Sequence, residues 1–538
     1  MAVERPLQVD TGRGLSLKYG QLWLYSSRNP VFQAVETVRN TKIEADTLYL
    51  IPSPCLGYGI QELLDVIPKS SAVLCIEAEH PLYDLYKSTA PNCFISKASD
   101  AIQAMNDIEQ ALGLHFRRCT ELRLSGGWAI HEKLYSQIKI SIDSHIAARF
   151  RNRLSMIKMG RLWTKNVIDN LAGMDWERLG LIENAQKPVL VCGAGPSLDL
   201  ILDDLAEVRS SLFILAADTA IGALYSQGIK ADAIVCLEAQ VYNTEDFLPL
   251  RGDGVAAIVD LTSHPSTFKN LNGSFCLCIS EWTESAFLSR LARGGLPVFP
   301  IPALASVGIL AIRIARILGG PILAAGLDFS FLPGKTHCSG SPARLKEERL
   351  EKRLWKQRSS WEAAIRSGVS RLKPGLFTDP ALSMYAELAA LELTEAKNEG
   401  ILCIDCRSSN TYPLPFHYAM DLKAAVKAAE LFIKSHGKDE KQRTFGQQAA
   451  SPDCKKTVMA FLANELHLLD KLGAALRHGM EKDSIKSLLA DCNYIFAHFP
   501  DPERVLALEI DALKRCSAEV AYWRGRLEMA MTRPGATA

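Results

Sequence analysis

Two glycines, a proline and a serine follow an apolar run in VLVCGAGPSLD, residues 189–199. Gly193 and Gly195 let the backbone turn tightly and let a ligand approach with no Cβ in the way. Pro196 and Ser197 suit the start of a helix, where free backbone amides can bind an anion. The stretch lacks the third glycine of a dinucleotide fingerprint and the Gly-Lys-Ser/Thr of a P-loop. Its spacing fits a phosphate-binding corner and a plain strand-to-helix turn equally well.

Acidic residues end the next apolar runs. Asp218 closes FILAAD and Glu238 closes AIVCLE. At the ends of parallel strands these carboxylates would share one sheet edge with the glycine corner, where they could bind ribose hydroxyls, a cation or an acceptor hydroxyl. The alternative for Asp218 is helix N-capping. Asp260, in AIVDLTSHP, belongs to the same class with less support.

A third stretch, GGPILAAGLDFSFLPGKTHCSG at residues 319–340, ends an apolar run at Asp328 and continues into a polar loop. His337 in that loop is a candidate general base, because histidine is readily tuned to accept a proton near neutral pH. The alternative is an ordinary exposed loop histidine. Lys335 could neutralise a phosphate or be a solvated loop charge.

The elements that must position these residues alternate along about 188–415. Short apolar runs separated by helical stretches predict a doubly wound, mainly parallel sheet covered on both faces. In such sheets ligands bind beyond the carboxyl ends of the strands. The runs are PVLVCGAG, SLFILAADTA, ADAIVCLEAQ, VAAIVDLTSH, SFCLCISE and PILAAGLDFS.

The N-terminal part reads as a βαβ unit, with ADTLYLIPSPCLGYGIQELLDVI followed by SAVLCIEAE. Gly57 and Gly59, with Glu77 about twenty residues later, would suit a nucleotide. The third glycine of the fingerprint is absent, so a packed α/β domain without a ligand is the alternative.

Helical periodicity dominates the remaining segments. The basic, periodic stretch 138–171 predicts a connecting helix, and polar 435–453 predicts a linker. The rest of the tail has i, i+3, i+4 apolar spacing. We predict an α/β protein with a Rossmann-like N-terminal domain at 1–145, a connecting helix at 146–187, a central domain at 188–415 and an all-helical C-terminal domain at 416–538.

Composition argues against several classes of function. The chain has 538 residues and a net charge of +1, so several domains are expected and nucleic acid is not an expected partner. Its 14 cysteines lie mostly in apolar runs, as reduced core thiols do. The pairs Cys276/Cys278 and Cys403/Cys406 lack a second pair at zinc spacing, so no metal site is predicted.

One segment, IPALASVGILAIRIARILGGPILAAGL, is apolar enough to raise the question of a membrane span. Arg313 and Arg316 in its middle favour a buried helix running into a strand, because central arginines are costly in hydrocarbon. The N-terminal MAVERPLQVDTGRG has no apolar signal region. We expect no membrane insertion and a cytoplasmic protein.

Three of these stretches resemble the central domain of the motility-associated factor (Maf) proteins, a family of flagellin glycosyltransferases. They are GAGPSLD, AADTAIGALYSQGIKADAIVCLEA and LASVGILAIRIARILGGPILAAGLDFSFLPGKTHCSG. CLGYGIQELL also resembles the glycine turn of that family's N-terminal domain, and the helical tail fits its third domain. The family's central domain is similar to bacterial sialyltransferases, which share a G-x-G-P-S-L turn beneath a CMP-sugar and a G-x-D-F strand end.

The resemblance implies transfer of a nonulosonic acid, of the pseudaminic or legionaminic type, from its CMP ester to Ser/Thr of flagellin before export, in support of flagellar assembly and motility. The partners would be flagellin and the CMP-activated sugar. CMP is a good leaving group, so no cofactor is required, although Mg²⁺ is compatible with the site. His337 and Asp218 would be catalytic, with His337 as the candidate base. The residues implied in binding the nucleotide sugar are Gly193, Ala194, Gly195, Pro196, Ser197, Asp218, Glu238 and Asp328.

Two other functions stay open. Archaeal relatives of the central domain resemble 6-hydroxymethylpterin diphosphokinases, which would use ATP and Mg²⁺, with Asp218 and Glu238 as ligands. A flagellar accessory protein that binds flagellin without turnover would use an apolar face of the helical tail.

Overall fold

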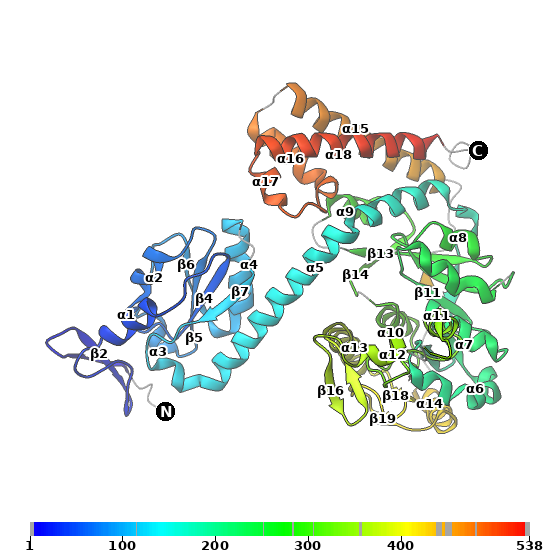
Figure 1. Cartoon of the computed structure of the whole chain (residues 1–538), viewed down its shortest axis with the longest axis horizontal. Coiled ribbons are helices and arrows are strands. Elements are labelled where there is room, and N and C mark those ends of the chain that lie inside the picture. Colours follow the sequence, from blue (N-terminus) through cyan, green and yellow to red (C-terminus); the bar gives the residue numbers. More distant parts are fainter. Residues whose placement is uncertain are drawn as a thin grey trace. The chain divides into compact units, whose positions relative to one another are not determined.

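The computed structural model describes residues 5–113, 116–184, 186–250, 252–281, 285–304, 306–354, 358–436, 444–446, 454–478 and 481–532 (Figure 1). The chain forms two compact units, Met1–Lys158 and Met159–Ala538. Both contain a parallel sheet, which confirms the predicted α/β class. The finer, four-part division of the chain stays a prediction.

The first unit is built on a four-stranded parallel sheet in the order β6-β5-β4-β7. Its two middle strands are buried along their whole length, as expected of apolar strands covered on both faces. The predicted βαβ unit is confirmed as β4, α2 and β5. Bounds in this unit are β1 Leu7–Asp10, β2 Leu15–Tyr19, β3 Leu22–Trp23, α1 Phe32–Arg39, β4 Thr47–Pro52, α2 Ile60–Val66, β5 Ala72–Glu77, α3 His80–Tyr83, β6 Cys93–Lys97, α4 Ala101–Leu112 and β7 Arg118–Glu121.

The glycine turn after β4 is filled by the protein's own side chains. A Cβ on Gly57 would lie 2.1 Å from the ring of Tyr86, so close packing requires a glycine there. Glu77 is buried, and it accepts a hydrogen bond of 2.7 Å from the Ser53 hydroxyl. Both features fit a packed turn.

The second unit is built on a nine-stranded sheet in the order β14-β13-β12-β11-β10-β9-β15-β18-β19, in which every pair is parallel. All six predicted strands are present, and β14, β18 and β19 were not predicted. The bounds are β9 Val189–Cys192, β10 Phe213–Ala217, β11 Ala233–Cys236, β12 Ala256–Asp260, β13 Phe275–Glu281, β14 Val298–Pro302, β15 Ile322–Ala325, β18 Cys403–Asp405 and β19 Tyr418–Ala419.

Helices cover both faces of this sheet, and two hydrophobic cores lie on either side of it. Helices α10 and α13 pack against each other, and their apolar side chains build one of the cores. The bounds of the helices are α5 Glu132–Gly173, α6 Leu202–Val208, α7 Ile221–Ser226, α8 Ser266–Asn270, α9 Ala286–Arg293, α10 Val307–Leu318, α11 Pro342–Leu350, α12 Arg358–Ala363, α13 Pro380–Asn398 and α14 Leu422–His436.

The apolar segment with two central arginines is a buried helix, α10, that runs into β15, as predicted. Arg313 pairs with Glu392 of α13 at 2.8 Å, and Arg316 pairs with the same carboxylate at 3.0 Å. Among the helices of the described residues, none has the length and apolar character to cross a bilayer.

The C-terminal helices share the other hydrophobic core with the sheet. Figure 1 shows α15 and α18 side by side, and Phe287 of α9 contacts the rings of Phe461 and Tyr494 at centroid distances of 5.5 and 5.0 Å. The predicted helical character of this region is confirmed. Its helices are α15 Cys454–His478, α16 Lys482–Asp491, α17 Pro502–Leu506 and α18 Ile510–Met531.

Most of the predicted linker, 435–453, lies outside the described residues. Within it, β20 (Thr444–Gly446) pairs antiparallel with β8 (Leu181–Glu183). Two further short strands, β16 (Ser370–Lys373) and β17 (Leu376–Thr378), form a hairpin.

Strand β9 is the first strand of the large sheet, with β10 on one side and β15 on the other. Strand order therefore reverses beside β9. In open α/β sheets ligands bind at such a switch point, beyond the carboxyl ends of the strands. The loops after β9 and β15 meet there.

Candidate active site

The glycine corner after β9 packs directly on the end of β15. The amide of Gly193 donates to the Ala325 carbonyl at 2.8 Å, and the amide of Gly195 donates to Gly326 at 2.7 Å. A Cβ on Gly195 would lie 2.6 Å from Cγ of Asp328. The two glycines are needed because two loops approach each other more closely than side chains allow.

The carboxylate of Asp328 lies at the N-terminal end of the short 3-10 helix Pro196–Leu200 and binds its backbone. The amide of Ser197 donates to one carboxylate oxygen of Asp328 at 2.8 Å, and the Ser197 hydroxyl donates to the other. Both residues are buried, and burial raises the pKa of Asp328 although the bonds from Ser197 oppose this. The Ser197 amide is therefore not free to bind a phosphate, because the Asp328 carboxylate already accepts from it. What the corner as a whole binds stays a prediction.

Arg407, to which the sequence analysis gave no role, stabilises the backbone just after β15. The buried Arg407 donates to the Leu327 carbonyl at 2.7 Å and pairs with Asp405 at 2.8 Å. Phe329, two positions after Leu327, has a φ of 48°. This backbone conformation is uncommon outside glycine and is strained. Such strain persists only where surrounding contacts fix the chain, and it is often found at functional sites.

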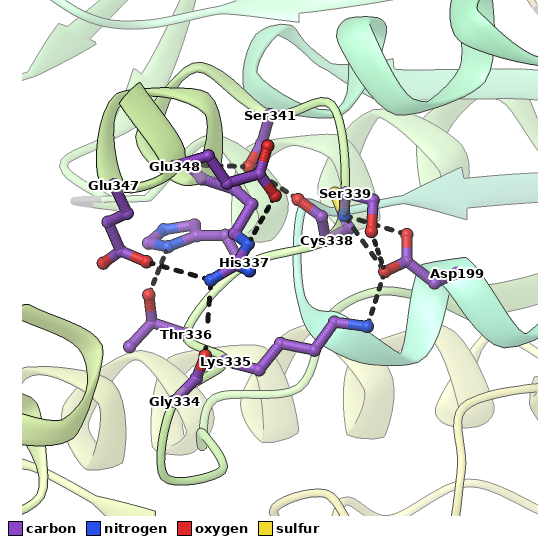
Figure 2. A network of polar contacts seen from close by, with 11 residues as sticks. Asp199, Gly334, Lys335, Thr336, His337, Cys338, Ser339, Ser341, Glu347 and Glu348 are labelled. Atoms are coloured by element: carbon purple, nitrogen blue, oxygen red, sulfur yellow. Dashed lines mark hydrogen bonds and ion pairs between the residues drawn. The ribbon is translucent and has the colours of Figure 1, made fainter. Parts of the chain in front are cut away.

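Residues 331–341, which we call the site loop, contact the glycine corner, and Figure 2 shows Lys335 and Ser339 of this loop directed toward Asp199. The Cys338 amide donates to the Ala194 carbonyl at 2.8 Å. Asp199 accepts from the Ser339 amide at 3.0 Å and pairs with Lys335 at 2.8 Å. Lys335 is thus tied to the corner, although its sequence context allowed a merely solvated charge.

The far end of the site loop is tied to two helices. A Cβ on Gly222, in α7, would lie 2.0 Å from the Gly340 carbonyl, so the loop touches the helix that follows Asp218. Ser341 caps α11 by accepting from the Arg344 amide at 3.4 Å. The Arg344 guanidinium in turn donates to the Gly334 carbonyl at 3.3 Å.

His337 lies inside the site loop and is partly buried. Its Nδ1 is 3.0 Å from the Thr336 hydroxyl, and Figure 2 shows its ring on the α11 side, toward Glu347 and away from Asp199. Burial lowers the pKa of His337, with Glu347 acting in the opposite direction. The imidazole is therefore neutral and able to accept a proton at neutral pH.

Asp218 lies at the end of β10 and is almost completely buried. It accepts hydrogen bonds of 2.8 Å from the Asn243 amide group and from the Thr219 backbone. Burial raises its pKa to about 6, against which these bonds act. The bond from Thr219 resembles the capping alternative, but it leaves a carboxylate that is ionised and still basic at neutral pH.

Asp246 was missed in the sequence because it lies within a 3-10 helix, Val241–Leu250, and not at a strand end. It is only 5% exposed, and among the described residues its carboxyl has neither a hydrogen bond nor an ion pair. Burial, then the charges of Asp218, Glu245 and Glu238, raise its pKa to about 8. At neutral pH this carboxyl is therefore mostly protonated.

Glu238, the remaining predicted acid, is exposed at the same edge. Its carboxylate accepts from the Gln240 amide at 3.0 Å, and its backbone carbonyl accepts from the His264 amide at 3.0 Å. Asp260 has a structural role. It is fully buried and accepts hydrogen bonds from the hydroxyls of Thr262 and Ser280, each at 2.6 Å, so it stabilises neighbouring strand ends.

The loops after β11 and β12 are positioned by α5. The side-chain amide of Asn166 donates to the carbonyls of Ala239 and Thr262 at 3.0 and 2.9 Å. Asn170, one helical turn later, donates to Leu261 and Ser263 at 2.8 Å. Two asparagines on one face of the helix therefore fix the backbone beside Glu238.

The cysteines are free thiols, mostly buried. The Cys276 thiol donates to the Gly180 carbonyl at 2.9 Å, and burial raises its pKa to about 12. Burial raises the pKa of Cys403 to about 12 as well. Among the described residues, no group of three or more His, Cys, Asp or Glu side chains is arranged to hold a metal ion.

Two groups of predicted residues thus lie at one sheet edge, and the site loop joins them. The first group is the glycine corner with Asp328. The second is Asp218 with Glu238, to which the structure adds Asp246. The loop that carries His337 contacts the corner at Ala194 and, through Gly340, the helix after Asp218.

Comparisons with known proteins agree with this architecture. Residues 165–334 match the family model described as 6-hydroxymethylpterin diphosphokinase MptE-like. An uncharacterized protein of Treponema pallidum (strain Nichols) is 26% identical in an alignment of 553 positions that covers 96% of this chain and 94% of that protein. The solved structure of a Maf glycosyltransferase from Magnetospirillum magneticum AMB-1 matches with a TM-score of 0.55 at 12% identity, covering 98% of this chain and 90% of that one. The fold along almost the whole chain is thus that of a Maf glycosyltransferase, which confirms the predicted resemblance.

Proposed function

We propose that the protein is a glycosyltransferase that moves a nonulosonic acid, of the pseudaminic or legionaminic type, from its CMP ester to Ser/Thr hydroxyls of flagellin. The transfer would take place in the cytoplasm before export and would support flagellar assembly and motility. The observation that carries the proposal is the meeting of the loops after β9 and β15 at the switch point of a sheet whose fold is that of a solved glycosyltransferase.

The donor would bind over the glycine corner, where Ala194 and Gly195 are half-exposed. Asp328 and Ser197 would act as the floor that shapes this corner, because their polar groups bind each other. Lys335, the lysine of the site loop, pairs with Asp199 beside this corner and would offset the negative charge of the CMP phosphate. No metal is needed, since CMP leaves readily.

The transfer forms one bond and breaks another. The acceptor oxygen bonds to the anomeric carbon, the bond from that carbon to the phosphate oxygen breaks, and CMP leaves with the electron pair. A base takes the hydroxyl proton. Asp218, ionised and basic, and His337, held neutral by burial, are the two candidates that the geometry offers.

The first test is nucleotide preference. CMP at 100 times its dissociation constant should stabilise the full-length protein by about 2.7 kcal/mol, whereas ATP should not. The second test is the intact mass of flagellin incubated with CMP-pseudaminic or CMP-legionaminic acid and the protein. Mass gain lost in Asp218→Asn but kept in His337→Gln would identify the base as Asp218, and the reverse result would identify His337.

The match to the MptE-like family favours a second candidate, an ATP-dependent pterin diphosphokinase. Asp218 and Glu238 would then bind Mg²⁺ together with the ATP phosphates. The match covers only residues 165–334, so this candidate gives no role to the residues before 165 or after 334. Stabilisation by ATP with Mg²⁺, but not by CMP, would support this candidate and reject the first.

A non-catalytic flagellin-binding protein is the third outcome that the same measurements distinguish. It would bind flagellin, show no stabilisation by either nucleotide and leave the flagellin mass unchanged.

A further inference from the structure

We propose that residues 342–354 and 358–373, which we call the docking segment, form the surface on which an acidic stretch of the acceptor polypeptide binds. The segment comprises α11, α12 and β16 (Figure 1). This proposal rests on the proposed function, because it assigns a place to the protein acceptor of the transfer.

Large apolar side chains in the docking segment face solvent. Leu354 and Ile365 are each 82% exposed, Leu350 is 62% exposed and Trp361 is 57% exposed. Most other apolar side chains of the second unit fill the two cores of the sheet, and the most exposed of the rest, such as Leu200 and Tyr242, lie far apart in the sequence. Exposed aromatic and aliphatic residues gathered in one short segment indicate an interaction surface.

The docking segment is also strongly basic. It contains nine Lys and Arg residues against four Asp and Glu residues, a local net charge of +5 in a chain whose total is +1. Six cations in its described part are exposed and have no acidic side chain within ion-pair distance among the described residues. They are Lys346, Arg349, Lys352, Arg353, Arg366 and Arg371. An acidic partner would complement this charge.

Hydrogen bonds connect the docking segment to the candidate active site. Ser341, the last residue of the site loop, caps α11, and Arg344 in the first turn of α11 donates to Gly334 in the loop. Figure 2 shows His337 beside this helix. A polypeptide bound along the segment would therefore lie next to the loop that carries a candidate base.

A polypeptide fits this surface better than a membrane does. Leu350 and Trp361 lie on two different helices, Leu354 and Ile365 lie outside both helices, and cations stand between these residues in the sequence. An interfacial helix would instead gather its apolar residues on one continuous face. Alternating apolar and charged contacts are typical of protein interfaces, which have an apolar centre and a polar rim.

The test uses two double variants of the full-length protein. Arg349→Glu with Arg353→Glu reverses charge in the docking segment, and Leu354→Ser with Ile365→Ser removes its most exposed apolar groups. The control, Lys482→Glu with Lys486→Glu, reverses the charge of two exposed lysines on α16. Binding to purified flagellin of the same organism is measured at low and high salt, together with stabilisation by CMP and binding to phosphatidylglycerol vesicles.

We expect each docking variant to bind flagellin at least tenfold more weakly, about 1.4 kcal/mol, whereas the control and the parent bind alike. Salt should weaken the parent's binding, and the CMP effect should be the same in all variants. Docking variants that bind like the parent, a parent that does not bind flagellin, or binding to vesicles in place of flagellin would each overturn the proposal. Failure of the proposed function shows separately as a parent that CMP does not stabilise, and variants that lose flagellin binding would then still support the docking surface.

Discussion

Replacing Asp246 by asparagine should stabilise the protein, and by more at high pH than at low pH. The carboxyl is buried without a hydrogen bond from the described residues, and burial with neighbouring negative charge raises its pKa from 3.8 to about 8. Between these two values the folded state keeps a proton that the unfolded state has lost. The unfolded state then binds fewer protons, so the free energy of unfolding falls as pH rises.

The size of the effect follows from the same pKa shift. Each pH unit within that window lowers the free energy of unfolding by about 1.4 kcal/mol. From pH 5 to pH 8 the parent should therefore lose about 4 kcal/mol through this one group, whereas the asparagine variant loses none of it. A buried asparagine amide has a desolvation penalty of about 1–3 kcal/mol, but that penalty is the same at every pH.

The assay is urea unfolding of both full-length proteins at pH 5 and pH 8, followed by tryptophan fluorescence. The quantity compared is the difference in unfolding free energy between variant and parent at each pH. Asp203→Asn, at an exposed position of α6, is the matched control and should show no such dependence. Equal differences at the two pH values for Asp246→Asn would refute the argument that its carboxyl is buried next to other charges.

Two further predictions concern the glycine corner and the site loop. Gly195→Ala should lower stability by about 1–3 kcal/mol, because its Cβ would meet Asp328 at 2.6 Å. The control is Gly525→Ala within α18, where an added Cβ would meet nothing, and it should raise stability by about 1 kcal/mol. Urea unfolding of both variants and the parent measures these changes. A Gly195→Ala variant as stable as the parent would contradict the close packing against Asp328. Asp199→Asn removes the ion pair to Lys335 at 2.8 Å, so trypsin should cleave the native site loop after Lys335 several-fold faster. Mass spectrometry of the digest gives the rate, and an unchanged rate would show that other contacts hold the loop.

Local sequence signals located the strands of the large sheet well. Each of the six predicted strands is a short apolar run ended by glycine or an acid, and such runs specify a buried parallel strand almost independently of their partners. The two arginines of α10 correctly excluded a membrane span, and Glu392 of α13 supplies their counter-charge. Strand β14 was missed because Pro300 and Pro302 weaken the strand pattern, which is tolerated at a sheet edge.

The inner arrangement of the candidate site could not be predicted from local sequence. Ser197 and Asp328 are 131 positions apart, so nothing near either residue indicates that one binds the other. Arg407 follows a strand of three residues that was not predicted, and its contact with Leu327 spans 80 positions. The raised pKa of Asp246 comes mainly from burial, and this burial depends on how the 3-10 helix after β11 packs.

The pairing of β9 with β15 has a consequence for folding during synthesis. Residues 189–192 have their second sheet neighbour only after residues 322–325 have been made. Until then β9 is an edge strand with unpaired backbone groups, and such edges are prone to wrong pairing. A nascent or truncated chain that stops before β15 should therefore aggregate, whereas the first unit, whose sheet is complete at β7, has all its strand partners much earlier.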